Sequence, residues 1–440
     1  MVWPYKVRVI GAGIAGLSFA VALIRKAKSC GLKEITSAHL QIDEADPGPS
    51  TEGAGIQLGP NVVRLLENDL GLQDPLKSLG FAPKGIRLCS LKTAKQLARL
   101  PLQDFQQRYG AGYLTIHRAA LHSALLNKLH ESGHKVNWSR SFEGAKDSGQ
   151  AQASSLELGI DCSTFEQDRM KESLLLVGAD GRQSTCRKLF NENTEHTSYV
   201  QGFSREPFYT GQVALRSLLT SLDHVPREQR EDVTVWVGPR HHLVGYPVFM
   251  PTHNGMCLLY NLVGFIEIPK TNNGINAEAA LKMGGWSSLA SKEEAGRLLS
   301  ALHPSLYWIK ESAQAWSSWP LWASPVIQSP DNHYKRHVFL IGDAAHAMRP
   351  HQAQGSAMAV EDACSLARHL TSSTGSLHER CLRAAEERWA RNARVQRQSF
   401  RNGRIFQFTG PMAWLRDRAL QLTGSKLMDQ PWLFRSPRIP

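Results

Sequence analysis

The sequence lacks a closely spaced cysteine pair and a long uninterrupted hydrophobic run. Its seven cysteines are scattered along 440 residues, and no two of them form a Cys-x-x-Cys motif. This odd, dispersed set is typical of neither a disulfide framework nor a zinc site, and it fits a reducing compartment. No apolar run reaches the roughly 18 residues that a membrane-spanning helix needs. The apolar stretch 7–24 is interrupted by glycines and has no small-residue cleavage site after it. We therefore expect a cytoplasmic protein with no membrane span and no metal site.

Internal repeats and low-complexity tracts are also absent, and the charge is moderate. The formal net charge of +12 favours anionic ligands or surfaces without naming one. Arginines recur near the C-terminus at a spacing that would form a cationic face on a helix. They are Arg380, Arg383, Arg388, Arg391, Arg394, Arg397, Arg401 and Arg404. Nucleic acid or an anionic membrane could meet such a face, but a solvated face with acidic partners in the same chain is the expected interpretation. We expect no nucleic-acid partner.

Apolar runs that alternate with helical periodicity predict an α/β protein. A strand at Lys6–Ile10, a helix at Ile14–Lys28 and a second strand near Ala38–Asp43 form a βαβ unit, which implies a parallel sheet. A helical pattern covers 115–130, and a fully apolar strand ends at Gly178. The first part of the chain is therefore expected to form a Rossmann-like domain.

The stretch 201–329 has a different character. Short apolar runs separated by Pro, Gly and Asn predict strands of an antiparallel sheet there. The α/β pattern returns with a strand at 337–343, and a helical tail follows from Ser376. We expect a Rossmann-like domain with an inserted antiparallel β-sheet substrate domain and a C-terminal helical tail. The expected boundaries are 1–80, 112–195 and 330–370 for the first domain, 81–111 and 196–329 for the inserted domain, and 371–440 for the tail.

A glycine motif, GAGIAG, lies between the first strand and the first helix. Gly11 permits a tight turn, Gly13 lets a pyrophosphate approach the backbone, and Gly16 lets helix and strand pack closely. An acidic residue at the end of the second strand should bind a ribose hydroxyl. Asp43 and Glu44 are both candidates, because neighbouring strand residues face opposite sides. The motif predicts a dinucleotide site, with a simple packing turn as the alternative, and it does not distinguish NAD from FAD.

Two further motifs place an aspartate at the end of an apolar strand. Asp180 and Gly181 follow the strand in LLLVGADG, and Asp343 follows the strand in FLIGDAAH. After Asp343 comes a loop, and a helix begins near Gly355 and Ser356. Carboxylates at these positions can accept hydrogen bonds from hydroxyl groups.

These three stretches together resemble the fingerprints of the single-component FAD-dependent aromatic monooxygenases, the family with the para-hydroxybenzoate hydroxylase fold. EGAGIQLGPN at 52–61, IHRAAL at 116–121, VALRSL at 213–218 and AQGSAMAVEDA at 353–363 add to the similarity. The resemblance spans 7 to about 370, and it looks strongest to the salicylate-hydroxylase-like branch and its fungal relatives. It implies that the Rossmann-like domain binds FAD.

The resemblance also assigns roles to the candidate cofactor residues. Asp343 would bond the ribityl chain, and the helix from Ser356 would direct its positive end at the flavin pyrimidine ring. Gly355 would allow close backbone approach. Asp180 and Gly181 would lie near the pyrophosphate and serve NAD(P)H docking. Arg118 would contact FAD, and Ala54 and Gly55 would border it.

The implied reaction uses NAD(P)H and dioxygen to hydroxylate or epoxidise an aromatic or unsaturated small molecule through a flavin hydroperoxide. Arg216 and Tyr246 are the candidate catalytic residues, because a cation favours a phenolate and a phenol can bond a substrate oxygen. Leu215 and Ser217 depart from the aromatic and glycine neighbours usual in relatives. A structural ion pair for Arg216 and a core position for Tyr246 are the alternatives.

The histidines are less specific. His351 is a possible substrate contact, His346 is expected to support the turn after Asp343, and His241 and His242 are expected to be strand residues.

Two other functions stay open at this point. One is different flavin chemistry on the same fold, although the WxWxIP signature of flavin halogenases is absent. The other is an FAD-binding protein without catalysis. Secondary metabolism or aromatic catabolism is the expected setting, and a monomer or homodimer the expected assembly; the sequence does not choose between NADH and NADPH.

Overall fold

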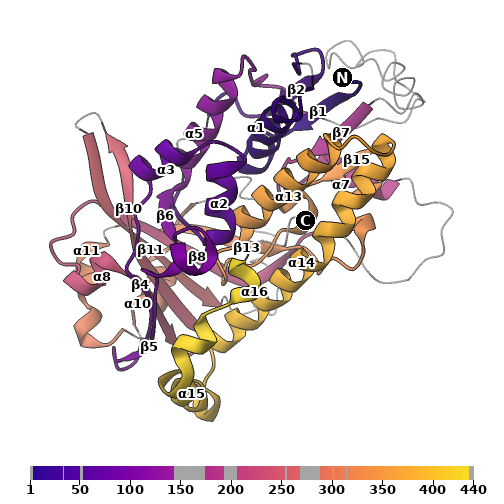
Figure 1. Ribbon diagram of the computed structural model, residues 1–440. Coiled ribbons are helices and arrows are strands. Elements are labelled where there is room, and N and C mark those ends of the chain that lie inside the picture. Colours follow the sequence, from indigo (N-terminus) through magenta and orange to yellow (C-terminus); the bar gives the residue numbers. More distant parts are fainter. Residues whose placement is uncertain are drawn as a thin grey trace.

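The computed structural model describes residues 3–32, 34–49, 53–142, 174–192, 206–252, 255–267, 288–300, 302–313, 315–335 and 337–435. Its strands form a five-stranded sheet, an eight-stranded sheet and a two-stranded sheet. Figure 1 shows the five-stranded sheet and its helices at one end of the molecule, and the eight-stranded sheet at the other.

The five-stranded sheet has the order β14-β15-β7-β1-β2. Four members run parallel, namely β1 (Lys6–Ile10), β2 (Leu40–Asp43), β7 (Leu174–Gly178) and β15 (Val338–Leu340), while β14 (Tyr334–Lys335) is antiparallel at the edge. Val9, Val177 and Phe339 are fully buried, which explains why these strands are apolar runs. All three predicted motifs follow the carboxyl ends of parallel strands, so they meet at one edge of the sheet.

The eight-stranded sheet is mostly antiparallel, as expected, with one parallel pair between β4 and β9. In order across the sheet its strands are β12 (Ser288–Leu289), β13 (Ser317–Ala323), β8 (Phe208–Leu219), β11 (Gly255–Glu267), β10 (His241–Thr252), β9 (Val233–Gly238), β4 (Gly85–Ser90) and β5 (Gln96–Pro101). Strands from 85–101 therefore join strands from 208–323 in one layer.

The small sheet pairs β3 (Gly55–Leu58) with β6 (Leu114–His117). The expectation of a helix from Thr115 is wrong, because helix α5 begins only at Arg118 and runs to Glu131. The β-branched Thr115 and Ile116 suit a strand, and β3 supplies the hydrogen-bonding partner that makes one possible here. Arg118 therefore lies at the first turn of a helix.

Helices cover the parallel sheet and link the two larger sheets. Helix α1 (Ile14–Ser29) packs against α5 and against α13 (Gly355–Leu370). In the described residues before α13, the other helices are α2 (Pro60–Asn68), α3 (Gln73–Leu79), α4 (Phe105–Tyr109), α7 (Thr185–Glu192), α8 (Arg227–Glu231), α10 (Lys292–Leu299), α11 (Trp308–Ser312) and α12 (Asp343–His346), with short 3-10 turns at Pro304–Leu306 and Pro330–Asn332.

The C-terminal part is helical, as expected. Helix α14 (Leu377–Phe406) begins with a capping box between Ser376 and Glu379, and it packs against α13. It runs to the far end of the molecule, where α15 (Gly410–Met428) lies against β5, and α16 (Pro431–Phe434) follows (Figure 1). Within the described ranges, no helix combines the length and apolar composition needed to cross a bilayer.

Candidate active site

The glycine turn after β1 has the geometry that a nucleotide phosphate needs. Gly11 has a φ of +99°, and a Cβ there would collide with the backbone carbonyl of Ala179. A Cβ on Gly16 would collide with the carbonyl of Gly11, so this glycine sets the close packing of helix on turn. Gly13 has no atom near a hypothetical Cβ, and it caps α1 without a side-chain hydrogen bond. The space beside Gly13 is therefore open, and the positive end of α1 would stabilise an anionic group placed there.

The structure separates the two acidic candidates at the end of β2. Asp43 is buried and is occupied by Arg8, at 2.6 Å, and by the Asn137 amide, at 2.8 Å. Glu44 instead accepts a hydrogen bond from the backbone N–H of Ala12, at 2.7 Å, inside the glycine turn. Glu44 is therefore the carboxylate that faces the nucleotide turn, and Asp43 holds the strand end in place.

The second motif lies directly against the first. A Cβ on Gly11 would lie 3.0 Å from Cα of Asp180. The Asp180 carboxylate accepts hydrogen bonds from the Ser184 hydroxyl, at 2.6 Å, and from the Cys186 N–H, at 3.1 Å. Gly181 has a φ of +72°, which allows the chain to turn into α7. Asp180 thus organises the start of α7 beside the nucleotide turn.

Asp343 begins α12 and is exposed to solvent. Desolvation by the surrounding protein nevertheless raises its pKa, while the positive charges of His346, Arg118 and Arg182 oppose that rise. The raised pKa indicates a desolvated carboxyl, whereas the solvent-accessible surface of Asp343 shows that it is exposed. We give more weight to the exposed surface, because it means that a ligand can reach the carboxylate. Its oxygens are available to accept hydrogen bonds from hydroxyl groups.

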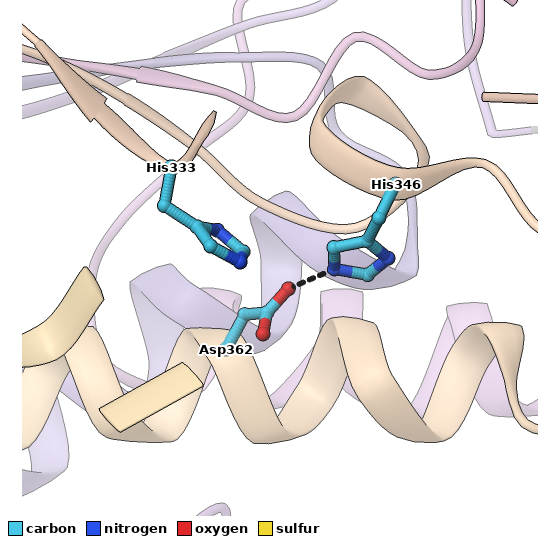
Figure 2. Close-up of side chains that lie close together, drawn as sticks. All are labelled: His333, His346 and Asp362. Atoms are coloured by element: carbon cyan, nitrogen blue, oxygen red, sulfur yellow. Dashed lines mark hydrogen bonds and ion pairs between the residues drawn. The ribbon is translucent and has the colours of Figure 1, made fainter. Parts of the chain in front are cut away.

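The turn that carries Asp343 is held from two sides. On one side Asp362 of α13 accepts a hydrogen bond from the Gly342 N–H, at 3.1 Å. It also accepts one from His346 Nε2, at 2.6 Å (Figure 2). On the other side the buried Arg187 of α7 donates to the Ala344 carbonyl, at 2.9 Å. The expectation that His346 supports the turn agrees with these contacts. Asp362 was not predicted as an anchor, because the resemblance of the stretch AQGSAMAVEDA gave this residue no role and its partners are distant in the sequence.

His333, His346 and Asp362 could in principle hold a metal ion, since their ligand atoms lie within 4.8 Å of one another. Figure 2 shows the two imidazoles on either side of the carboxylate. The Asp362 carboxylate, however, also accepts hydrogen bonds from Arg388, at 2.9 Å, and Asn392, at 2.8 Å. A guanidinium in contact with the same carboxylate opposes a metal cation. We interpret the cluster as a hydrogen-bonded anchor.

Helix α13 starts at Gly355, one residue before the predicted Ser356, and its first turn is open. Gln354 caps the helix without a side-chain hydrogen bond to it, and a Cβ on Gly355 would meet no atom. The positive end of the helix is thus accessible to a group with negative charge. One turn further on, the buried Glu361 pairs with Arg388, at 2.7 Å, and Arg391, at 2.6 Å, which fixes α13 to α14.

Ala54 and Gly55 lie where the small sheet meets the large one. The Ala54 carbonyl accepts a hydrogen bond from the Arg118 N–H, at 3.1 Å. The Gly55 carbonyl accepts one from the Tyr246 hydroxyl, at 2.5 Å, and its N–H donates to the Asn261 side chain, at 3.0 Å. A Cβ on Gly55 would lie 2.6 Å from the Tyr246 ring, so only glycine fits. The structure therefore brings the predicted cofactor-border segment into contact with the predicted catalytic tyrosine.

Tyr246 is buried in the middle of β10. Burial raises the pKa of its hydroxyl, and the nearby charge of Arg216 acts in the opposite direction. The phenol therefore stays protonated at neutral pH and serves as a hydrogen-bond donor.

Arg216 belongs to β8, the strand that pairs with β11 on one side and with β13 on the other. Its guanidinium lies 4.5 Å from the centroid of the Trp319 ring, and its Nε is buried without a hydrogen-bond partner in the described residues. Desolvation lowers its pKa, Arg118 adds to that effect and Tyr246 counters it. Arg216 forms no ion pair with any of the described residues, and the group that contacts its guanidinium is the Trp319 ring. A cation held in this way favours an anionic or phenolic ligand.

The remaining histidines belong to a packed region. His241 and His242 lie in β10, as expected. His351 is buried, accepts or donates a hydrogen bond with Gln212 at 3.1 Å, and packs edge-on against His242 and Phe265. Burial lowers the pKa of His351 to about 3, so it is neutral.

The fold and site define a protein with a nucleotide-type glycine turn at the edge of one sheet and with Arg216 and Tyr246 on two strands of the other. Residues 4–399 match the family model of the FAD binding domain. The chain is 29% identical over 433 residues to 3-amino-4-hydroxybenzoate 2-monooxygenase of Streptomyces cremeus, covering 95% of this chain and 92% of that one. It is 29% identical over 401 residues to 6-hydroxynicotinate 3-monooxygenase of Bordetella bronchiseptica, covering 90% and 91%. The structure of a salicylate hydroxylase substrate complex superposes with a TM-score of 0.66 at 18% identity and covers 100% of both chains.

The chain belongs to the FAD binding domain family, and it is an FAD-dependent aromatic monooxygenase. The residues present fit FAD: an open helix terminus beside Gly13, Glu44 facing the turn, and an exposed Asp343 beside cations. NAD(P)H is the reductant typical of the family.

Proposed function

We propose that FAD lies along the carboxyl edge of the parallel sheet, held by the residues of the three motifs. Gly11, Gly13, Gly16 and the start of α1 would receive the pyrophosphate, Glu44 the ribose, and Asp343 the ribityl chain. The open first turn at Gly355 and Ser356 would face the flavin ring, and Arg118, Ala54 and Gly55 would border it. Asp43, Asp180 and Gly181 would act mainly by shaping this edge. The supporting observations are the open glycine turn and the exposed Asp343.

The substrate proposed is a small aromatic ring that carries a hydroxyl and an acidic group. Arg216 supports this proposal most directly, because a desolvated guanidinium with an unpartnered buried Nε calls for an anionic or phenolic partner. The names of both curated relatives specify hydroxylated aromatic acids. Arg216 would hold the ring and favour its phenolate, which is the electron-rich form that accepts oxygen.

Tyr246 would donate its hydroxyl proton as a hydrogen bond to a substrate oxygen. Without substrate this single proton is donated to the Gly55 carbonyl, so the hydroxyl would turn from the cofactor border to the substrate when the substrate binds. Bound FAD supplies the electrons and activates dioxygen. The protein's own task is to orient the ring and to keep water away.

Arg216→Ala tests this assignment. Removal of the guanidinium should leave FAD bound but reduce kcat/KM for a hydroxylated aromatic acid by at least about 30-fold, since a buried charge contact is lost. Product is measured by the mass gain of one oxygen, and uncoupled NAD(P)H oxidation by peroxide release. Arg227→Ala, in the exposed helix α8, is the matched control. Unchanged product formation in Arg216→Ala would remove this residue from the mechanism.

The finer expectations stay proposals. The three-part domain division would follow the two large sheets, although parts of its ranges lie outside the described residues. Membership of the salicylate-hydroxylase-like branch of fungal type rests only on the motifs, because an 18% identity supports the fold alone and the two named relatives are bacterial. A cytoplasmic location is supported by the six cysteines that lie in the described residues, all of which are free there. A monomer or homodimer, epoxidation in place of hydroxylation, and a setting in secondary metabolism or aromatic catabolism are likewise proposed.

A further inference from the structure

Helix α15 is apolar on its solvent side as well as on the side that packs against the protein. Five of the ten exposed large hydrophobic side chains among the described residues lie on this one helix. They are Met412, Trp414, Leu415, Leu422 and Leu427, and Leu422 is 84% exposed. Single exposed hydrophobic residues are ordinary, but a concentration of this kind marks an interaction surface. We call this set the α15 surface.

The α15 surface combines apolar and basic side chains along one stripe. Leu415 and Leu422 are seven residues apart, so they lie on the same side of the helix. Arg418 lies between them and Lys426 lies one turn beyond, and both are exposed. The Arg418 guanidinium is 5.7 Å from the centroid of the Trp414 ring. Long basic side chains next to Trp and Leu are typical of helices that lie in the interface of a bilayer.

The opposite side of α15 is already occupied. Gly424 faces Ala98 of β5 so closely that a Cβ would collide with it. Arg416 is buried and donates to the carbonyls of Ile405 and Phe406, at 3.2 and 2.9 Å. Because these contacts fix the helix to the body of the protein, the α15 surface is held outward.

The charge around the α15 surface is strongly positive. Residues 394–429 include seven arginines and lysines and two acidic residues, of which Asp429 is paired with Arg108. Asp417 is already paired with Arg416. On the adjoining end of α14, Arg397 and Arg401 are exposed and have no ion pair in the described part of the chain. The expectation that acidic partners neutralise the tail therefore holds for Arg388 and Arg391 and not for this end.

The sign of the charge decides between the possible occupants. A second copy of the chain has the same net charge of +12 and would bring like charges together. An anionic lipid surface attracts these cations and accepts the apolar side chains. We propose that the α15 surface attaches the protein reversibly to an anionic lipid bilayer, without spanning it.

This attachment is compatible with the catalytic site. Helix α15 lies at the end of the molecule remote from β1 and β7, where the nucleotide turn is found (Figure 1). A bilayer at α15 therefore leaves the edge of the parallel sheet uncovered. The proposal does not depend on the identity of the aromatic substrate.

The test is co-sedimentation of the FAD-loaded protein with vesicles of phosphatidylcholine alone or mixed with phosphatidylserine. We expect binding to the mixed vesicles at low salt, weak binding to phosphatidylcholine, and release as salt rises. Leu415→Gln with Leu422→Gln should weaken binding at least about tenfold, because each leucine loses apolar burial in the bilayer. Arg418→Gln with Lys426→Gln should weaken only the phosphatidylserine-dependent part.

Leu289→Gln is the matched control, because Leu289 is equally exposed, at 82%, but lies on β12. It should bind vesicles like the unchanged protein. FAD absorption and circular dichroism of each variant report whether the fold is intact. The proposal is overturned if the unchanged protein stays in the supernatant with phosphatidylserine vesicles at low salt, or if the double leucine variant binds as well. A dimer seen by ultracentrifugation that the leucine changes abolish, without vesicle binding, would assign the α15 surface to a second copy.

Discussion

Single side chains at the sheet edge show how neighbouring residues of similar chemistry take different tasks. Asp43 and Glu44 are adjacent carboxylates, but only Glu44 contacts the glycine turn, through the Ala12 N–H. Asp43 is occupied by Arg8 and Asn137. The alternation of a strand predicts that one of the two faces the ligand, and only the partners in space decide which.

Glu44→Gln tests the choice between the two acids. Loss of the charge weakens the hydrogen bonds that a carboxylate makes, so the Kd for FAD should rise about tenfold, which corresponds to about 1.4 kcal/mol. Fluorescence titration of the apoprotein with FAD measures the change. In Asp43→Asn we expect a lower Tm as the main effect, because Arg8 loses its partner. An unchanged Kd in Glu44→Gln would contradict the assignment.

Tyr246→Phe tests the phenol separately from the ring. The ring still fills its buried site, whereas the hydrogen bond to Gly55 and the proposed bond to substrate are lost. We expect kcat/KM to fall about fivefold while FAD stays bound, since a neutral hydrogen bond contributes about 1 kcal/mol. Steady-state kinetics and flavin absorption give the two readouts. Full activity in this variant would return Tyr246 to a core role.

At the scale of elements, the sequence predicted those helices, strands and turns that depend on residues close together in the chain. The three motifs, the strand at Lys6–Ile10 and the helix after Ser376 follow from apolar periodicity, glycine and capping residues. The strand at Leu114–His117 could not be separated from α5, because its partner β3 is more than fifty positions away in the sequence.

The residues that anchor the turn carrying Asp343 could not be predicted from the sequence either. Asp362 and Arg388 are 26 positions apart and meet only when α13 packs on α14. Desolvation acts to raise the pKa of the Asp362 carboxyl, but the charges of His346 and Arg388 outweigh it and hold that pKa below its usual range. The sequence pattern predicts only that Asp362 is an acidic residue on a helix. The packing of α13 on α14 shows that Asp362 is the buried counter-ion of Arg388.

Asp362→Asn tests whether this anchor positions Asp343. The amide cannot accept hydrogen bonds from the turn, His346 and Arg388 together, and it leaves a buried guanidinium underpaired, so unfolding should become easier by about 3 kcal/mol. FAD affinity should fall although Asp362 is not expected to touch FAD, because the turn that carries Asp343 loosens. Thermal unfolding and FAD titration of the same samples measure both effects. Loss of stability with an unchanged Kd for FAD would limit Asp362 to a structural role.

At the scale of the whole molecule, buried neutral histidines at contacts between distant segments make stability depend on pH. His351 joins the loop after α12 to β8, and His333 lies between β15 and α14. Burial lowers the pKa of His333 to about 4 and that of His351 to about 3, from ordinary values of 6.5. At pH values between the lowered pKa of each histidine and its ordinary value of 6.5, the unfolded chain binds more protons than the folded chain. The free energy of unfolding therefore falls as pH falls through this range.

We expect full stability above about pH 6.5 and a loss of up to about 1.4 kcal/mol per pH unit for each histidine below it. The carboxyls of Glu361 and Asp362, with lowered pKa values, lose their contribution only at more acidic pH. Urea unfolding of the protein at a series of pH values measures the slope. His351→Gln should make the slope shallower, and an equally steep slope in this variant would argue that His351 is not a buried neutral group.

The central claim is that three separated segments form one FAD site at the edge of the parallel sheet. The most direct test is calorimetric titration of the folded apoprotein with FAD, for the unchanged chain and for Asp343→Ala. We predict one FAD bound per chain and a clearly weaker affinity in the variant, whose circular dichroism should be unchanged. A folded, unchanged chain that takes up no FAD, or a variant that binds it just as tightly, would contradict the claim.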